Sequence, residues 1–287
     1  MLVETTNDDE KNLIRLGASS FSNKDWVGPF YPPGTRPAQY LEFYARHFST
    51  VEIDSTYYAV PSASTVDGWS LKTPEDFIFS LKFPAAICHG GEGPQPNPDI
   101  LLMPEKTFEI RDRFLHIAAR LGKRSGPLIL QFPYFARDVF ASADPFLERL
   151  EIFLKDLPLE FRYAVEIRNR NWLNSDFADL CRRHQVCLVL TDYAGMPMAD
   201  EMMEKFDPIT TDFAYIRLIG NRKQIEAITT TWDREVIDRG DRLKRWAEVM
   251  RGFARRRIKT FIYVNNHYAG YAPETLRRLT RMIWEER

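Results

Sequence analysis

The sequence has little cysteine, no excess of charge of either sign, and no long apolar run. Three cysteines in 287 residues are too few for a disulfide scaffold and point to a reducing compartment. The acidic, polar start MLVETTNDDEKN is unlike a signal peptide, so we expect a cytoplasmic protein. No run approaches the roughly 20 apolar residues of a membrane helix. With 39 Lys and Arg against 40 Asp and Glu, the charge balance argues against a nucleic-acid binder.

What the chain does have is a regular alternation of short apolar segments with longer amphipathic ones. The eight segments typical of strands are 14–20, 49–56, 77–83, 127–133, 163–168, 186–192, 213–219 and 261–266. Helical spacing predicts helices at 37–48, 105–122, 144–157, 175–184, 241–257 and 273–287, with Ser175 as an N-cap.

Eight strands separated by helices favour one fold class. Parallel βαβ units in this number and length match a single (β/α)8 TIM-like barrel, which we place at 13–287 after a flexible tail at 1–12. A doubly wound sheet is the alternative. Two stretches rich in Pro, Gly or polar residues, 84–104 and 220–240, are predicted to be irregular loops at the carboxyl-end mouth of the barrel.

Polar side chains recur on one face of these strands. Residues two apart share a face, so Val51 and Ile53 lie opposite Glu52 and Asp54. Helices cover the outside of a barrel, so the polar face should look inward, near the mouth where barrel active sites lie. The residues expected there are Glu52, Asp54, Lys82, Gln131, Glu166, Arg168, Asp192, Arg217 and Asn265. Buried ion pairs that set strand register are the alternative, but polar groups from seven strands favour a functional site.

Several of these residues lie in motifs that resemble those of a known family. Gly17-Ala18-Ser19, WVGPFYP at 26–32 and VEIDSTYY at 51–58 resemble the opening of the YecE-like family, a domain of unknown function. Later matches are Ser80-Leu81-Lys82, Gln131-Phe132-Pro133, Glu166 and Arg168 before Trp172, Arg217, and Asn265-Asn266. The resemblance covers 13–286; it implies a TIM-like barrel and no particular activity.

The chain departs from the family pattern at two positions of chemical interest. Ile219 stands where a His is common, and His267 stands where an Asp is more usual. If relatives use the strand-seven His as a ligand or base, this chain lacks it, and whether His267 replaces its function is left open.

The first functional hypothesis is an enzyme, a hydrolase, lyase or isomerase, acting on a small anionic or polyhydroxylated substrate. Four inward acids face three inward bases, which suits a mixed pocket with Arg forks for an anion and carboxylates for proton transfer. The predicted catalytic residues are Glu52 or Glu166 as general base, Lys82 as general acid or charge stabiliser, and Asp192. The predicted ligand-binding residues are Ser19, Asp54, Tyr57, Gln131, Arg168, Arg217, Asn265 and Asn266, with Arg168 and Arg217 as the anion clamp.

Two alternatives stay open. The first is a metal-dependent isomerase or phosphoesterase of the endonuclease type, in which carboxylates hold Mg²⁺ or Mn²⁺. Asp54 and His89 are its candidate ligands, although no HxH or HExxH spacing is present and the first hypothesis requires no cofactor. The second is non-catalytic binding of a small ligand or nucleic acid by aromatics such as Trp26, Phe30 and Tyr31, which more commonly pack at loop bases. The sequence does not indicate an oligomeric state.

Overall fold

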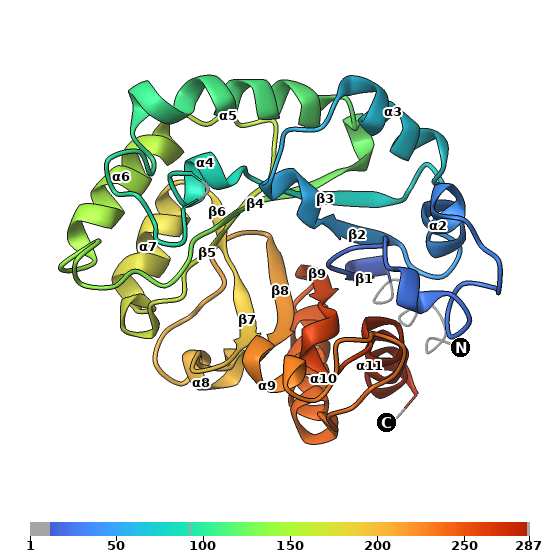
Figure 1. The fold of residues 1–287 in the computed structure, drawn as a ribbon. Helices are drawn as coiled ribbons and strands as arrows, with labels where there is room; N and C mark the ends of the chain where they lie inside the picture. The colour runs from blue at the N-terminus through green and yellow to red at the C-terminus, as the bar shows by residue number, and fades with distance from the viewer. Residues whose placement is uncertain (1–11, 92, 286–287) are drawn as a thin grey trace, which may run out of the picture. The chain divides into compact units, whose positions relative to one another are not determined.

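All eight predicted strand segments form strands, and the sixth forms two (Figure 1). The computed structural model describes residues 12–285 except residue 92; the predicted flexible tail lies outside the described residues apart from its last position. The strands are β1 (Ile14–Ala18), β2 (Thr50–Ile53), β3 (Ile78–Lys82), β4 (Ser125–Gln131), β5 (Tyr163–Glu166), β6 (Val186–Leu188), β7 (Leu190–Tyr193), β8 (Phe213–Gly220) and β9 (Lys259–Val264).

All six predicted helices are present, and the described residues form four more, one of nine residues and three of four or five. The helices are α2 (Pro37–Tyr44), α3 (Ala63–Leu71), α4 (Ala85–Cys88), α5 (Pro104–Ala119), α6 (Asp144–Lys155), α7 (Ser175–Arg183), α8 (Ala199–Met203), α9 (Arg222–Glu226), α10 (Gly240–Arg255) and α11 (Ala272–Trp284). The predicted irregular loops are wrong in part, because α4 forms within 84–104 and α9 within 220–240. Asn221 caps α9 by accepting a hydrogen bond from the Gln224 N–H. The cap of α7 is Asn174 rather than Ser175, since the Asn174 side chain accepts from the Phe177 N–H.

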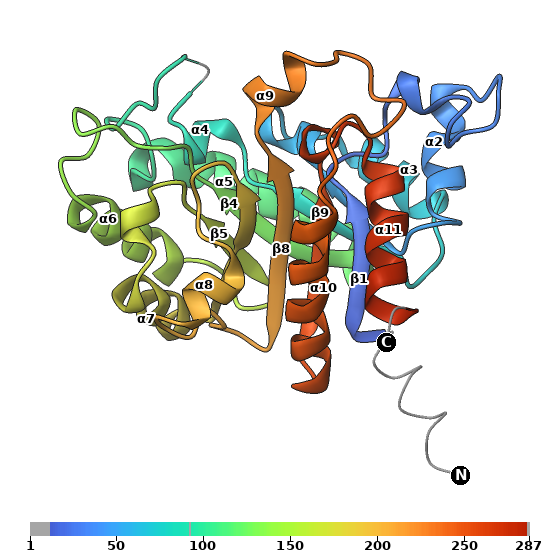
Figure 2. The ribbon, with the colours of Figure 1, turned by 90° about the horizontal axis from the view of Figure 1, so that it is seen from below.

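The chain divides into two compact units, which we describe separately. The first unit contains the residues up to Glu52, Leu190–Lys205, and those from Asp212 onward. Its sheet has the strand order β1-β9-β8-β7, with every pairing parallel. Figure 2 shows α10 and α11 side by side against this sheet. All eight residues of β8 are buried, as expected for a parallel strand covered on both faces.

One glycine of the first unit is fixed by a close approach of two backbones. A Cβ added at Gly17 on β1 would lie 2.0 Å from the carbonyl oxygen of Thr50. No side chain fits there, so the glycine of the Gly-Ala-Ser motif allows β1 to pack against the chain that enters β2.

The second unit consists of Ile53–Val189 and Phe206–Thr211. Its strands β3, β4, β5 and β6 pair in that order, all in parallel, and Gln131 at the end of β4 is in register with Glu166 at the end of β5. Aromatic side chains fill the space between this sheet and its helices; Phe83, for example, packs against Phe114 of α5 and Phe153 of α6.

The predicted sixth strand is divided at Val189. Its first part, β6, pairs with β5 in the second unit, and its second part, β7, pairs with β8 in the first. In the second unit Thr210 secures β6, because its hydroxyl accepts from the Leu188 N–H and donates to the Val186 carbonyl.

Candidate active site

One group of polar side chains in the second unit surrounds Lys82, the last residue of β3. The Lys82 Nζ lies 3.4 Å from Asp54 Oδ1 and 4.8 Å from the centre of the Tyr57 ring. Lys82 is only 8% exposed, whereas the Asp54 side chain is 32% exposed. An almost buried ammonium is therefore held by a carboxylate that still reaches solvent.

A short turn places these side chains. The sequence predicted Asp54 on a strand, but β2 ends at Ile53 and a 3-10 turn takes up Asp54–Tyr57. The hydroxyl of Thr56 accepts a hydrogen bond from the Lys82 N–H at 2.9 Å and donates to the Lys82 carbonyl at 2.8 Å. This double contact fixes the turn to the end of β3, so that Asp54 and Tyr57 face the Lys82 ammonium.

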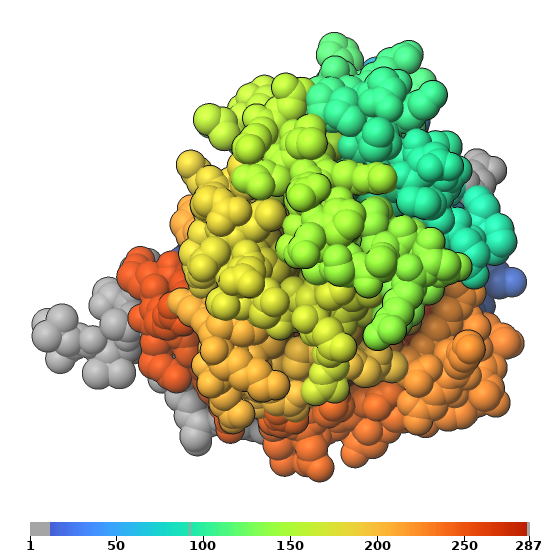
Figure 3. Space-filling view, turned by 90° about the vertical axis from the view of Figure 1, so that its left-hand side faces the viewer, coloured from blue at the N-terminus to red at the C-terminus, as the bar shows by residue number. Residues whose placement is uncertain are grey.

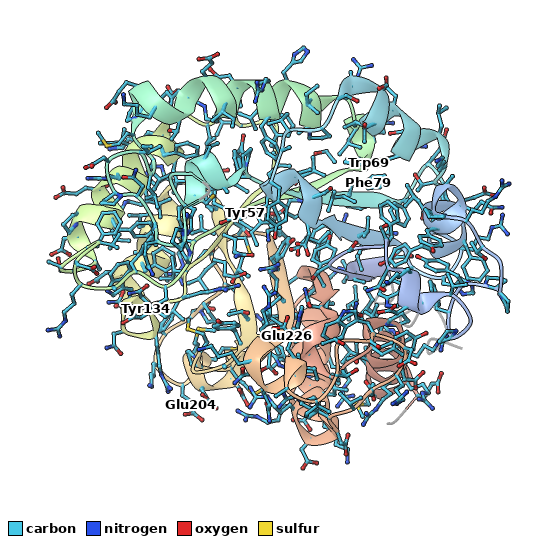
Figure 4. All side chains as sticks on the ribbon, in the orientation of Figure 1. Tyr57, Trp69, Phe79, Tyr134, Glu204 and Glu226 are labelled. Carbon is cyan, nitrogen blue, oxygen red and sulfur yellow. The ribbon has the colours of Figure 1, made fainter. Side chains whose placement is uncertain are left out.

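A second ion pair of the same unit follows β5. The Arg168 Nε donates to Glu166 Oε1 at 3.0 Å, and Glu166 is fully buried while the Arg168 side chain is 19% exposed. The Arg168 charge also acts on Tyr57, where it lowers a pKa that burial raises to about 12. We call Asp54, Tyr57, Lys82, Glu166 and Arg168 the Lys82 cluster; Tyr57 is labelled in Figure 4.

The cluster has an apolar floor and an adjoining pocket. Cys88 of α4 is buried, and burial raises the pKa of its thiol despite the charge of Lys82. The backbone at Gln131 hydrogen-bonds this thiol. Tyr57 also lines a pocket of about 490 Å³ together with Pro84 and Arg113. Cys88 is thus a protonated packing residue, and the adjacent Cys88 and His89 do not form a nucleophile and base.

The first unit uses its predicted carboxylate Glu52 differently. Glu52 is fully buried, and its two oxygens accept from Arg217 Nη2 at 2.7 Å and the Tyr215 hydroxyl at 2.6 Å. Burial and the Glu52 charge raise the pKa of Tyr215, so its hydroxyl stays a donor. Arg217 has only 2% of its side chain exposed. This placement favours a structural role for Glu52 over a general base, and leaves Arg168 as the more accessible arginine of the predicted clamp.

Asp192 is also surrounded by donors within the first unit. Arg242 approaches it with Nη2 at 2.6 Å and Nε at 3.0 Å, Trp246 donates through Nε1 at 2.9 Å, and the Tyr268 hydroxyl donates at 3.0 Å. Burial and the Asp192 charge raise the pKa of Tyr268, which keeps that hydroxyl protonated. These partners come from α10 and the turn after β9, and no sequence pattern marks them.

The asparagines after β9 have local roles. Asn265 Oδ1 accepts from the His267 N–H at 2.9 Å and lies 2.7 Å from His267 Nδ1, while Asn266 Oδ1 accepts from the Ala272 N–H. His267 Nε2 lies 3.2 Å from Glu226 of α9. The Oγ of Ser19 is buried and makes no hydrogen bond with the described residues. His267 thus contacts Asn265 on one side and Glu226 on the other, and ties α9 to the turn that begins at Asn266.

Neither candidate metal ligand belongs to a cluster of ligands. His89 Nδ1 lies 3.2 Å from the Gly91 carbonyl oxygen, and Asp54 pairs with Lys82. The described part of the chain holds no group of three or more His, Cys, Asp or Glu residues able to bind a metal ion. It also contains no helix that is both long and apolar enough to span a membrane.

The aromatic residues near the first strand pack against one another. Trp26 contacts Phe30 at 5.8 Å and Tyr31 at 6.0 Å between ring centres, and all three are buried. They form part of the core of the first unit.

Comparison with known proteins gives a consistent family. Residues 15–287 match the family described as protein of unknown function DUF72. The UPF0759 protein YecE of Escherichia coli K12 is 34% identical over 157 residues, which are 55% of this chain and 49% of that protein. The UPF0759 protein YunF of Bacillus subtilis is 26% identical over 165 residues, 58% of this chain and 54% of that protein. The chain thus spans about half the length of the curated relatives it matches.

Solved structures extend the similarity to the fold. The crystal structure of a DUF72 family protein from Thermotoga maritima has a TM-score of 0.65 and 26% identity, covering 95% of this chain and 99% of that chain. A DUF72 family protein from Enterococcus faecalis has a TM-score of 0.63 and 22% identity, covering 94% and 97%. The predicted α/β, TIM-like barrel class and the predicted family resemblance are both confirmed.

Proposed function

Since the chain belongs to the DUF72 family, whose description names no activity, its chemistry must follow from its own side chains, and we propose that it is an enzyme. It acts on a small anionic or polyhydroxylated substrate by general acid/base catalysis at the Lys82 cluster. No metal or other cofactor enters this proposal.

The ammonium of Lys82 is the observation that carries the proposal. Removing a charged group from water is expensive, and buried ion pairs seldom stabilise a fold relative to apolar residues of equal size. Lys82 is nevertheless 8% exposed, at the carboxyl end of a parallel strand, beside a partly exposed carboxylate. Charges retained at this end of a parallel strand are typical of active sites in α/β barrels.

Each member of the cluster has a chemical role in the proposal. Arg168, oriented by Glu166, binds the anionic group of the substrate. Lys82 donates a proton or stabilises negative charge that develops on a substrate oxygen. The raised pKa of Tyr57, about 12, makes its hydroxyl a permanent donor near neutral pH. Asp54, the more exposed carboxylate, is the general base in place of the buried Glu52.

Binding of small anions tests the site without knowledge of the substrate. Isothermal titration with malonate and with inorganic phosphate compares the wild type with Lys82→Met and Arg168→Gln. Lys123→Met is the control, because Lys123 is an exposed lysine of the same unit. We expect at least about a tenfold loss of affinity in the first two variants and no change in the control. Unchanged affinities in both cluster variants, or loss of the fold in both, would contradict the proposal.

Proton transfer is tested separately. The protein is incubated in D₂O with a panel of hydroxy acids and sugar acids. Proton NMR then follows the replacement of the C–H hydrogen next to the carboxylate by deuterium. The exchange rate with a responsive substrate should fall by about 10² to 10⁴ in Asp54→Asn, the usual effect of removing a general base. An equal rate in Asp54→Asn would remove Asp54 from the mechanism.

A further inference from the structure

The second unit has another pocket, near the loops that follow β4 and β5. It has a volume of about 320 Å³, and residues that follow β4 and β5 line it, including Tyr134, Arg137, Arg170 and Trp172. Figure 4 labels Tyr134, and the space-filling view of Figure 3 shows the green segment after β4 spread over the surface. The pocket shares no residue with the Lys82 cluster.

The floor of this pocket is held in place. Asn169 accepts from the Phe135 N–H and donates through Nδ2 to the Phe135 carbonyl, both at 2.8 Å, which joins the two loops. The Trp172 ring stacks at 27° on Phe135 and on Phe146, with ring centres 5.9 and 5.5 Å apart. Trp172 is half-buried, so it presents a fixed aromatic surface rather than a mobile side chain.

The side chains around that floor are aromatic or cationic. Tyr134 is 64% exposed although it is a large aromatic residue. Arg137 and Arg170 are both exposed, and none of the described residues that line the pocket is acidic. Within the part of the chain that the structure describes, the Arg137 side chain makes no ion pair or hydrogen bond.

We propose that this pocket binds a small ligand that joins a flat aromatic ring to an anionic group, of the kind and size of a nucleoside monophosphate. The ring would stack against Trp172 and Tyr134, whose faces suit planar ligands. Arg137 would pair with the phosphate through two parallel N–H donors. A volume of about 320 Å³ is at the lower end of the range for small-ligand pockets and fits one such molecule.

The test measures separately what the aromatic ring and the anionic group of the ligand contribute to binding. AMP, UMP, adenosine and inorganic phosphate are titrated against the full chain by calorimetry. We expect AMP or UMP to bind and both adenosine and phosphate to bind at least about tenfold more weakly. Arg137→Gln should lower nucleotide affinity about tenfold and reduce its salt dependence, while Tyr134→Ala should weaken AMP and adenosine by the same factor. Arg162→Gln, an exposed arginine just before β5, is the control and should change nothing.

Three results would overturn the proposal. One is the absence of AMP and UMP binding in the millimolar range. Another is nucleotide binding that Arg137→Gln and Tyr134→Ala leave unchanged. The third is binding of a single-stranded oligonucleotide that is at least tenfold tighter than AMP, because the site would then recognise a polymer rather than a single nucleotide.

Discussion

Replacing Asp192 by Ala is expected to destabilise the fold rather than to affect only ligand binding. In the wild type this carboxylate receives hydrogen bonds from Arg242, Trp246 and Tyr268. Trp246 and Tyr268 are fully buried, whereas the Arg242 side chain is 38% exposed. The substitution therefore leaves two buried donors without an acceptor, while water solvates the arginine.

The size of the effect follows from those donors. A buried donor that loses its acceptor costs about 1–3 kcal/mol, so two of them give about 4 kcal/mol. The exposed arginine adds at most about 1 kcal/mol. At about 2.1 cal/mol/K of unfolding entropy per residue, 4 kcal/mol lowers the Tm of a 287-residue chain by about 7 °C.

Calorimetry or circular dichroism measures the midpoint of thermal unfolding (Tm), with Arg242→Ala as the matched control. Arg242→Ala should lower the Tm by about 2 °C, because it removes only the more exposed partner. In the Asp192→Ala background, Tyr268→Phe should cost almost nothing further, because its hydroxyl no longer has an acceptor. A Tm within 1 °C of the wild type in Asp192→Ala, combined with lost ligand binding, would refute the structural role.

Four further predictions concern other parts of the chain. Glu52→Ala removes the carboxylate paired with the buried Arg217 and should cost about 3–5 kcal/mol in urea unfolding, most of it recovered in Glu52→Gln/Arg217→Met. Gly17→Ala should cost more than about 2 kcal/mol by the same assay, because the new Cβ would overlap the Thr50 carbonyl. Burial lowers the pKa of His267 below 6.5, partly opposed by Glu226. As the pH falls, His267 is therefore protonated in the unfolded chain before it is protonated in the folded one. The free energy of unfolding should fall as the pH drops below about 6.5. An ordinary or raised pKa of the His267 ring, measured by NMR, would contradict this. Titration with Mg²⁺ or Mn²⁺ should show no binding tighter than the millimolar range, and a tighter site would favour the metal alternative.

The strands could be predicted because parallel strands covered on both faces appear as short apolar runs. The break at Val189 could not be predicted, because the sequence from Val186 to Leu190 is continuously apolar across it. What changes at Val189 is only the neighbouring strand: β6 pairs with β5, and β7 pairs with β8. Helices such as α4 and α9, of four and five residues, are too short to show a 3.6-residue period.

The candidate site was predictable to a similar degree. Alternation correctly marked Lys82 and Glu166 as polar residues at the ends of β3 and β5, whereas Arg168 lies two residues beyond the end of β5. It could not supply their partners: Arg242 contacts Asp192 from 50 positions away, on a helix whose own pattern indicates only which face is apolar. Asp54 was placed on a strand because the polar alternation continues past Ile53, where the backbone has already turned.

The Thr56 hydroxyl has a consequence for redesign of the protein. It bonds to the backbone N–H and carbonyl of residue 82, and neither bond depends on which side chain that residue carries. The backbone position of residue 82 is therefore held by Thr56 whatever side chain the residue carries. A histidine or a glutamate installed there would start from the same point beside Asp54 and Tyr57, so that the acid/base character of the strand end can be exchanged while its scaffold is kept.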